Sequence, residues 1–257
     1  MGDRGCEDRR MDRGDVAPEG VVRIRAANPS PLTLDGTNTY VAGGWVVDPG
    51  PDDPAHLDAV FDAAGGAIEG IALTHGHHDH SEGAAALAER AGGVKVVLPE
   101  HEGRLGPFDV LATPGHSPDH VALLFGRVLF AGDTVLGTGS VFIMPGEGSL
   151  SAYLRSLRRL RELDLEVIAP GHGPFVWDPR AKLDEYIEHR LDRERRVIDA
   201  LDAGAASRDE ILERAWSDVD FGDTPYLRMA AGLTLDAHLE KLREDGRELT
   251  VEPGTPA

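Results

Sequence analysis

Cysteine is almost missing from this sequence: the only one among its 257 residues is Cys6. A single thiol cannot form a disulfide within the chain, and Cys6 lies outside any motif that would make it a nucleophile or a metal ligand. Any metal chemistry must therefore use imidazole and carboxylate groups.

Long apolar runs are missing as well. The stretch 120–131 is interrupted by glycine and charge well before the roughly 18 residues that a membrane-spanning helix needs. The first residues are charged and contain no apolar segment of the kind found in secretory signals. We therefore expect a soluble, cytoplasmic protein with no membrane partner.

Positive charge is scarce. The chain has 26 Lys and Arg against 45 Asp and Glu, which gives a net charge of −19. Acidic residues also outnumber basic ones in 208–257. Since phosphate contacts require clustered basic side chains, this balance disfavours duplex DNA as a partner. It leaves room for a local cationic site, because bound divalent metals are themselves strong positive charges.

Composition and periodicity divide the chain into four segments. Residues 1–20 are charged and aperiodic, which predicts a disordered tail. In 21–179, short apolar strands alternate with helices, which is typical of α/β (α+β) architecture. Residues 180–204 form a charged amphipathic linking helix, and 205–257 form a small C-terminal domain.

The C-terminal segment is expected to be mostly helical. Ser207 and Glu210 form a capping box for a helix over 208–216. Thr224-Pro225 begins a second helix, and Leu233–Arg243 forms a third. Residues 247–253 have the composition of a short strand.

Turn signals organise the beginning of the core. Gly43-Gly44 separates two apolar runs and predicts a two-residue hairpin. A helix is expected over 54–64, followed by a buried strand over 71–74. That strand runs directly into a histidine-rich loop, after which Ser81 begins a predicted helix to about Gly92.

The histidine-rich loop has the pattern H-x-H-x-D-H. It contains His75, His77, Asp79 and His80 immediately after the predicted strand. Metal sites need several imidazoles and carboxylates that converge on one point, and a tight loop with Gly76 can turn alternate side chains inward. His78 then points outward to solvent.

Three more candidate ligands follow three other predicted strands. His116 lies in TPGHS, Asp133 in AGDT and His172 in PGHG. Ligands at the ends of several strands can meet at one edge of a sheet, where loops carry function on a rigid scaffold. The four loops together predict a metal centre.

These segments resemble the metallo-β-lactamase fold superfamily over roughly residues 21–200. The resemblance implies an αββα sandwich with two metal ions, zinc being expected and iron or manganese being alternatives. It implies His75, His77 and His116 on the first ion, Asp79, His80 and His172 on the second, with Asp133 bridging. It also implies a metal-bridging hydroxide as nucleophile and catalytic roles for Asp79 and Asp133.

A closer resemblance is carried by GTNTYV, VVDPG, THGHHDHSEG, TPGHSPDHVALL, GDTVLGTGSVF and PGHGP followed by YIEHRLDRE. Together these motifs are similar to the β-lactamase-like protein 2 subgroup, whose animal members include an endoribonuclease acting on single-stranded RNA. The subgroup also has a small winged-helix-like C-terminal domain, which agrees with the helices expected in 205–257. The resemblance therefore implies an RNA phosphodiesterase.

Two alternatives stay open at this stage. A thioesterase resembling glyoxalase II has the same H-x-H-x-D-H core and would act on a small-molecule ester, although the C-terminal segment does not look like that family's glutathione-binding helices. A non-catalytic binding or regulatory module that contains the same metals is an alternative of another class. Sequence alone does not choose the substrate or the oligomeric state.

Other residues have two interpretations each. Asp48, at a strand end, either orients a histidine ligand or caps a turn. His120 either lines the pocket or packs in the core.

The loop with Gly137, Gly139 and Ser140 lacks the lysine of a phosphate-binding loop, and we expect it on the substrate side. The arginines of 180–202 are interleaved with acids, which predicts a solvated helix face.

Overall fold

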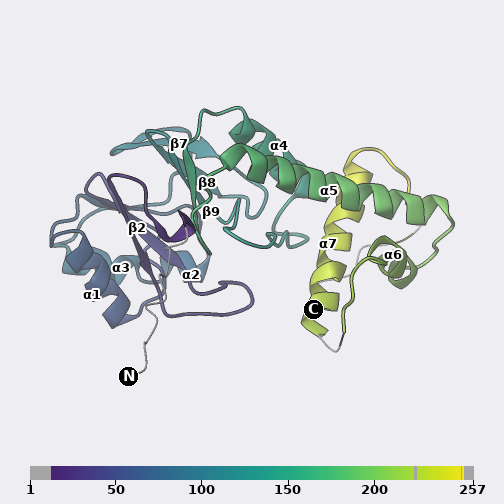
Figure 1. Cartoon of the computed structure of the whole chain (residues 1–257), viewed down its shortest axis with the longest axis horizontal. Helices are drawn as coiled ribbons and strands as arrows, with labels where there is room; N and C mark the ends of the chain where they lie inside the picture. Colours follow the sequence, from purple (N-terminus) through teal and green to yellow (C-terminus); the bar gives the residue numbers. More distant parts are fainter. Residues whose placement is uncertain (1–12, 223–224, 250, 252–257) are drawn as a thin grey trace, which may run out of the picture.

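Two mixed five-stranded sheets face each other in a computed structural model that describes residues 13–222, 225–249 and 251 (Figure 1). The first sheet has the order β1-β2-β3-β4-β5 and the second the order β10-β9-β8-β7-β6. The strands of the first are β1 Val21–Arg25, β2 Asn38–Ala42, β3 Trp45–Val47, β4 Gly70–Ala72 and β5 Val96–Val97. Those of the second are β6 Gly103–Leu105, β7 Phe108–Ala112, β8 Val121–Phe125, β9 Val128–Gly132 and β10 Val167–Pro170.

Apolar side chains from both sheets fill the space between them. Tyr40 of β2 packs at 5.2 Å from Phe130 of β9, measured between ring centroids, and Phe108 of β7 lies in the same cluster. Helices α1 Pro54–Ala63 and α3 Ala84–Arg90 cover the outer face of the first sheet. Helices α4 Leu150–Arg161 and α5 Pro179–Asp202 cover the second. The predicted αββα sandwich is therefore confirmed.

The predicted hairpin joins β2 to β3. The two strands pair antiparallel, and Gly43 and Gly44 have φ values of 54° and 81°. Two consecutive positive φ angles belong to the type I′ turn, whose twist matches that of the strands it joins. The expected helix over 54–64 is confirmed as α1 as well.

The helix expected after Ser81 begins earlier and in two pieces. The short α2 His78–Ser81 lies inside the histidine-rich segment, and α3 follows at Ala84. Three members of the predicted loop are therefore on a single helical turn, where neighbouring side chains point in different directions. His78 is exposed while His80 is buried, because residues two apart on a helix point to nearly opposite sides of its axis.

Helix α4 is held at its first residue by Ser149, whose Oγ accepts a hydrogen bond from the amide of Ala152. Replacing Ser149 by alanine should lower the free energy of unfolding by about 1 kcal/mol, because the amide loses its partner. For a domain of this size the melting temperature should fall by roughly 2–4 °C in a circular-dichroism melt. Ser149→Asp keeps an acceptor and serves as the control; equal losses in both variants would contradict the capping role.

The C-terminal segment contains α6 Arg208–Ala215 and a single long helix, α7 Pro225–Glu244. The second and third helices predicted from the sequence are therefore one, and that prediction is wrong. Nothing between residues 225 and 244 breaks a helix except Gly232, whose cost of about 1 kcal/mol is tolerated. A Cβ at Gly232 would lie only 2.6 Å from a guanidinium nitrogen of Arg208, which pairs with Asp236 one turn later.

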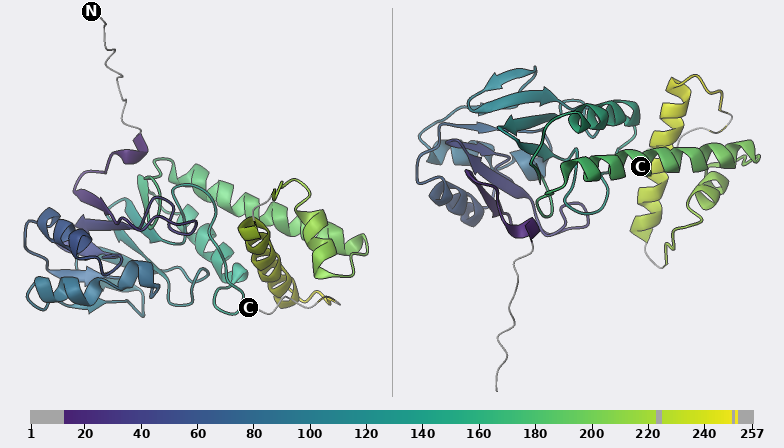
Figure 2. Two further views of the ribbon diagram at one scale, coloured as in Figure 1. Left: turned by 90° about the horizontal axis from the view of Figure 1, so that it is seen from below. Right: turned by 45° about the horizontal axis from the view of Figure 1, so that its top comes forward.

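Helix α7 crosses α5, as Figure 2 shows. The two helices and α6 share an apolar cluster that includes Val197, Ile211 and Leu239. Among the described residues of 247–253, none is in a strand. The short strand predicted over 247–253 is therefore absent from its described residues, 247–249 and 251, and the winged-helix arrangement stays a prediction.

The predicted disordered tail is too long. Arg13–Asp15 form a 3-10 turn, and the Gly14 carbonyl accepts a hydrogen bond from the amide of Phe175. Ala17 packs against the cluster between the sheets. The rest of the predicted tail, residues 1–12, lies outside the described residues. In the part of the chain that is described, no helix is both long enough and apolar enough to cross a membrane.

Candidate metal centre

All four loops that the sequence singles out end at the same edge of the sandwich. The loop after β4 and the turn of α2 bring His75, His77, Asp79 and His80, and the loops after β7, β9 and β10 bring the others. The side chains that meet there are His75, His77, Asp79, His80, His116, Asp133 and His172. The structure thus brings together all seven predicted ligands.

One group consists of His75, His77 and His116. Their nearest nitrogens lie within 4.8 Å of one another, and Nδ1 of His77 is 3.0 Å from Nε2 of His116. Three imidazoles at this separation can share one tetrahedral cation.

A second group consists of Asp79, His80 and His172. Nε2 of His172 is 3.2 Å from Oδ2 of Asp79 and 3.3 Å from Nε2 of His80. Oδ2 of Asp79 is also 3.5 Å from Nε2 of His80. Two imidazoles and one carboxylate again converge on a point, with the charge of the carboxylate suited to a cation.

Asp133 lies between the two groups. Its Oδ1 is 3.4 Å from Nε2 of both His80 and His172, while its Oδ2 is 3.6 Å from Nε2 of His116. One carboxylate therefore presents an oxygen to each group, which is the geometry needed to bridge two cations.

Buried atoms without partners test whether cations fit here. Nε2 of His75 and Oδ1 of Asp133 are buried and make no hydrogen bond. A buried polar atom left without a partner costs about 1–3 kcal/mol, so such atoms need a compensating ligand. Imidazole nitrogens and carboxylate oxygens are donors that zinc and iron accept. The donor set thus fits a pair of divalent cations.

In each of the five imidazole rings, the nitrogen that faces away from the centre also has a polar partner. Asp48 acts on two of these rings. Its Oδ2 accepts from Nδ1 of His80 at 2.9 Å and from Oγ1 of Thr74 at 2.7 Å. Oγ1 of Thr74, having donated its proton to Asp48, accepts from Nδ1 of His75 at 3.0 Å. In both rings Nδ1 donates a proton outward, so Nε2 is the nitrogen that faces the centre and can bind a cation there. These contacts are the ones that the first of its two interpretations, orienting a histidine, requires.

Backbone carbonyls and one acid orient the other three rings. Nδ1 of His116 donates to the Phe142 carbonyl at 2.9 Å, and Nδ1 of His172 faces the Gly36 carbonyl at 3.4 Å. His77 is turned the other way: its Nε2 lies 3.0 Å from Oε1 of Glu147 while Nδ1 faces the centre. Such partners fix the tautomer and direction of a ligand ring.

His120 is a packing residue and does not line the cleft. It is 1% exposed, and its Nε2 accepts a hydrogen bond from the amide of Asp133 at 3.1 Å. Nδ1 must then carry the proton, which it donates to Oγ1 of Thr113 at 2.8 Å. Burial lowers the pKa of His120 to about 3, so the ring stays neutral. Through this hydrogen bond His120 holds the backbone of Asp133.

Burial and neighbouring charges set the ionisation of the centre. Burial, reinforced by His80 and His120, holds the pKa of His75 well below its ordinary value. Burial also opposes the charged form of Asp133, but His80 and His172 outweigh it and hold the pKa of that carboxyl well below its usual range. Asp133 is thus an anion and His75 a neutral donor, the forms that bind a cation. Burial opposes the charged forms of His80 and His172, but the neighbouring carboxylates, Asp133 above all, outweigh it; they hold the pKa of His80 well above its ordinary value and raise the pKa of His172 to about 9, so a bound cation has to displace a proton from each of these rings.

A cleft of about 510 Å³ opens over the centre. Its floor includes His77, Asp79, His116, Asp133 and His172. Its walls are mainly apolar and come from three places: the loop before β2, the loop between β9 and α4, and helix α7. None of the described residues that line it is Lys or Arg. Its volume is typical of small-molecule sites.

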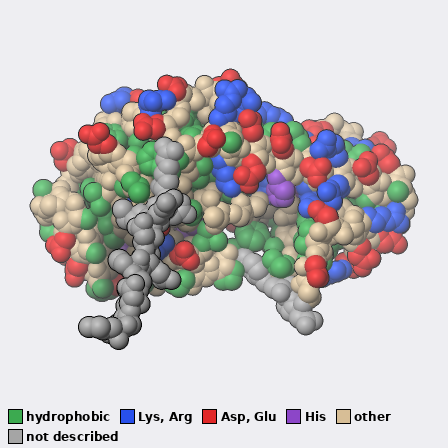
Figure 3. Space-filling model, in the orientation of Figure 1, with side chains coloured by type: hydrophobic (Ala, Val, Ile, Leu, Met, Phe, Trp, Pro, Cys, Tyr) green, Lys and Arg blue, Asp and Glu red, His purple; other side chains and the backbone are tan. Residues whose placement is uncertain are grey.

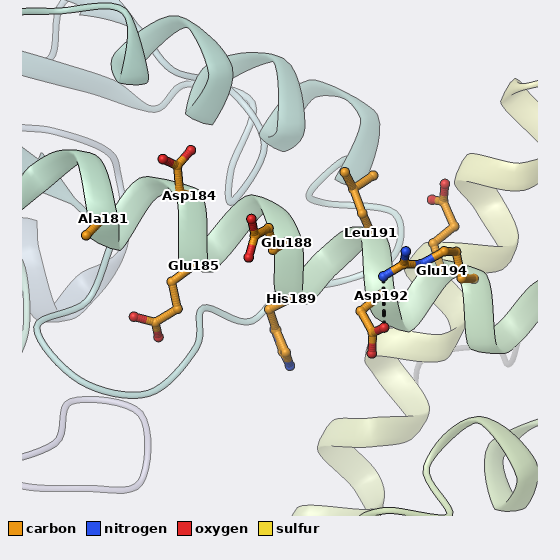
Figure 4. A pocket seen from close by; sticks show the side chains of 9 residues that line it. Ala181, Asp184, Glu185, Glu188, His189, Leu191, Asp192 and Glu194 are labelled. Atoms are coloured by element: carbon orange, nitrogen blue, oxygen red, sulfur yellow. Dashed lines mark hydrogen bonds and ion pairs between the residues drawn. The ribbon is translucent and has the colours of Figure 1, made fainter.

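A larger hollow of about 1080 Å³ lies elsewhere, open along α5 (Figure 4). Charged side chains line it, including Asp184, Glu188 and Asp192, and Arg195 is paired with Asp192 at 2.9 Å. It contains none of the seven candidate ligands. This part of α5 is the solvated, ion-paired face that the sequence predicts.

Two arginines of the same helix depart from that prediction. Arg190 and Arg193 are only 3% and 6% exposed. Arg193 stacks on Trp216 and pairs with Asp218 at 3.0 Å, and Arg190 donates to Ser140 and to the Val141 carbonyl. The sequence pattern missed this because α6 and the loop after β9 cover that side of the helix only in the folded chain.

Several residues around the centre were not predicted. Thr74, Glu147 and the Phe142 carbonyl each bond to a candidate ligand. Thr74 immediately precedes the motif, which is a usable signal. Glu147 and Phe142 lie in an irregular loop whose position depends on tertiary packing, so no sequence pattern points to them.

Comparison with known proteins agrees with this geometry. Residues 32–112 and 102–172 match the Metallo-beta-lactamase superfamily. The Beta-lactamase-like protein 2 homolog of Caenorhabditis elegans is 33% identical over 260 residues, covering 89% of this chain and 85% of that protein. The Atrochrysone carboxyl ACP thioesterase of Aspergillus chevalieri is 31% identical over 205 residues, covering 70% of this chain and 65% of that protein.

A solved structure is also similar. The protein TTHA1623, solved in a di-iron-bound form, has a TM-score of 0.50 and 32% sequence identity, covering 66% of this chain and 97% of that one. The predicted resemblance to the β-lactamase-like protein 2 subgroup is confirmed by its homologues. With its sandwich fold, its His and Asp cluster and these relatives, the chain belongs to the metallo-beta-lactamase superfamily of hydrolases.

Proposed function

We propose that this hydrolase binds two divalent cations, zinc in the first instance, and cleaves an uncharged carboxylic ester or thioester. The observation that carries the proposal is Asp133, whose two oxygens face two separate ligand groups at the floor of an apolar cleft. His75, His77 and His116 would hold one cation, and Asp79, His80 and His172 the other.

The roles of the residues follow from their positions. A bound pair of divalent cations acidifies water, which supplies a nucleophile near neutral pH, and polarises the electrophilic oxygen of the substrate. Asp133 keeps the two cation sites together. Asp79, whose side chain is 31% exposed beside the cleft, is the carboxylate placed to accept the proton of the attacking water.

The identity of the bound metal, zinc or iron, is a separate question. Histidine and carboxylate donors suit iron as well as zinc, and the similar protein TTHA1623 was solved in a di-iron-bound form. We keep zinc as the proposal because a group of three imidazoles and a group of two imidazoles with one carboxylate both suit tetrahedral zinc. Elemental analysis of the purified protein decides between them.

The lining of the cleft favours a carbonyl substrate over RNA. Binding of single-stranded RNA relies on basic grooves and on aromatic platforms for the bases. The described lining residues contain no Lys or Arg and only one Phe, Tyr or Trp, Phe142, whereas Asp79, Asp133 and Glu147 contribute negative charge. Thioester cleavage is also the activity in the name of the similar Aspergillus chevalieri protein.

A substrate panel tests the proposal. Zinc-loaded protein should hydrolyse p-nitrophenyl acetate and an acyl thioester with a kcat/KM at least tenfold higher than for bis-p-nitrophenyl phosphate or a single-stranded RNA. The reason is that the cleft wall has no Lys or Arg among its described residues to stabilise the charge of a phosphodiester. S-lactoylglutathione tests the glyoxalase II-like alternative. All the activity should disappear in His77→Ala and on chelation. Preferential RNA cleavage would replace the proposal by the RNA phosphodiesterase predicted from sequence.

A further inference from the structure

Helix α7, far along the chain from the metal ligands, supplies part of the cleft wall. Met229 and Leu233 both line the cleft, four residues apart and thus on one face of the helix. Leu32, from the loop before β2, and Met144, from the loop after β9, line the same cleft. Three segments widely separated in sequence therefore present aliphatic side chains to one space.

These side chains are exposed to an unusual degree for their type. Leu32 is 58% exposed, Met229 55% and Met144 41%, and all three belong to the short set of large apolar residues that the described surface leaves in water. Figure 3 shows hydrophobic side chains along the notch between the sandwich and the C-terminal helices. An exposed apolar patch rimmed by polar groups usually marks a binding site.

The placement of the α7 wall is fixed by polar contacts. Nζ of Lys241 on α7 binds Oε1 of Glu194 on α5 at 3.0 Å. Glu244 at the end of α7 accepts a hydrogen bond from Ser151 of α4. Arg190 of α5 also holds the loop after β9 through the Val141 carbonyl. The wall and this loop are thus attached to the same helix.

We propose that the α7 wall, made of Met229 and Leu233, is together with Leu32 and Met144 a substrate subsite that binds the hydrocarbon part of an ester or thioester. The proposal rests on the proposed function, because it places the scissile carbonyl over the cation sites. Each methylene removed from water in the subsite strengthens binding by a similar amount, so affinity grows with chain length until the cleft is full.

The two methionines of the cleft indicate what kind of hydrocarbon the subsite accepts. Met144 and Met229 have unbranched, flexible thioether side chains that adapt to irregular shapes. A cleft lined by such residues from two separate segments accepts flexible aliphatic chains of different lengths better than one rigid ring system. The C-terminal helices therefore set substrate choice, while the sandwich carries the chemistry.

A chain-length series tests the subsite. For p-nitrophenyl esters from acetate to decanoate, kcat/KM of the zinc-loaded protein should rise about threefold per methylene and then level off. A parallel series of alkyl thioacetates shows whether the hydrocarbon lies on the acyl or the thiol side; a rise in either series supports the subsite. In Met229→Glu the ratio of the best long-chain rate to the acetate rate should fall about tenfold.

Leu227→Glu is the matched control. Leu227 is on the same helix and 44% exposed, but it lines a smaller hollow of about 220 Å³ and not the cleft. Its chain-length profile should equal that of the unaltered protein. Flat profiles in both series, or equal effects of the two substitutions, would overturn the subsite.

A binding measurement separates this inference from the proposed function. 2-Decanone has the hydrocarbon chain and a carbonyl but no bond to hydrolyse. Calorimetry should show that it binds at least tenfold more tightly than 2-butanone, with a negative heat-capacity change, and that Met229→Glu removes the difference. If no ester is cleaved but this difference remains, the proposed function fails and the subsite stands. If esters are cleaved and the difference is absent, the subsite fails alone.

Discussion

Asp133→Asn should lower kcat/KM for ester hydrolysis by about a thousandfold, the scale seen when one charge-stabilising group is removed from a reacting centre. The aspartate presents Oδ1 to His80 and His172 and Oδ2 to His116, at 3.4 to 3.6 Å. Asparagine has the same shape but offers a single oxygen, and its NH₂ group turns protons toward one of the cation sites. Elemental analysis should find one cation per chain or fewer, against two in the unaltered protein.

The control for this substitution is Asp109→Asn. Asp109 is an exposed carboxylate on β7 that pairs with Arg104 at 2.9 Å and is none of the candidate ligands. Its variant loses the same charge and should keep both the cations and the rate. If Asp133→Asn retained two cations and a rate within threefold of the unaltered protein, Asp133 would not bridge.

The local part of this architecture could be predicted from the sequence. Each candidate ligand lies just past an apolar strand, and the ends of neighbouring strands meet wherever the sheet forms. His116, Asp133 and His172 follow β7, β9 and β10, which run in one direction in the second sheet, so these three meet at one edge, whereas His75 follows β4 of the first sheet and joins them only when the two sheets pack. The hairpin at Gly43-Gly44 was predictable for a similar reason, since its turn type depends on two adjacent residues.

The non-local part could not be predicted. Whether Arg190 faces water depends on α6 and on the loop after β9, which cover α5 only in the folded chain. The contribution of Met229 to the cleft depends on the angle at which α7 crosses α5, and no periodicity within α7 specifies that angle. His120 had two open interpretations because its partners, Thr113 and the Asp133 amide, lie on separate segments.

Asp48→Asn should weaken metal binding by about 10- to 100-fold, the usual cost of losing a residue that orients a metal-ligating histidine. Asp48 is 2% exposed and holds His80 directly and His75 through Thr74. It thereby affects a donor in each of the two ligand groups. The backbone at Asp48 has a φ of 49°, which asparagine adopts as readily as aspartate, so the substitution adds no strain.

The loss of metal affinity in Asp48→Asn should come from the hydrogen bonds that its two oxygens accept. Oδ1 accepts from the amide of Thr74 and Oδ2 from two further donors. Asparagine can satisfy the donors on one side only and turns its own NH₂ protons toward the other, which frees either the His80 ring or the Thr74 amide. Competition with a chromophoric chelator measures the affinity, and Asp52→Asn, an exposed carboxylate four residues away, is the control. Equal affinities in the two variants would show that Asp48 only shapes its turn and that the rings are oriented by the other contacts.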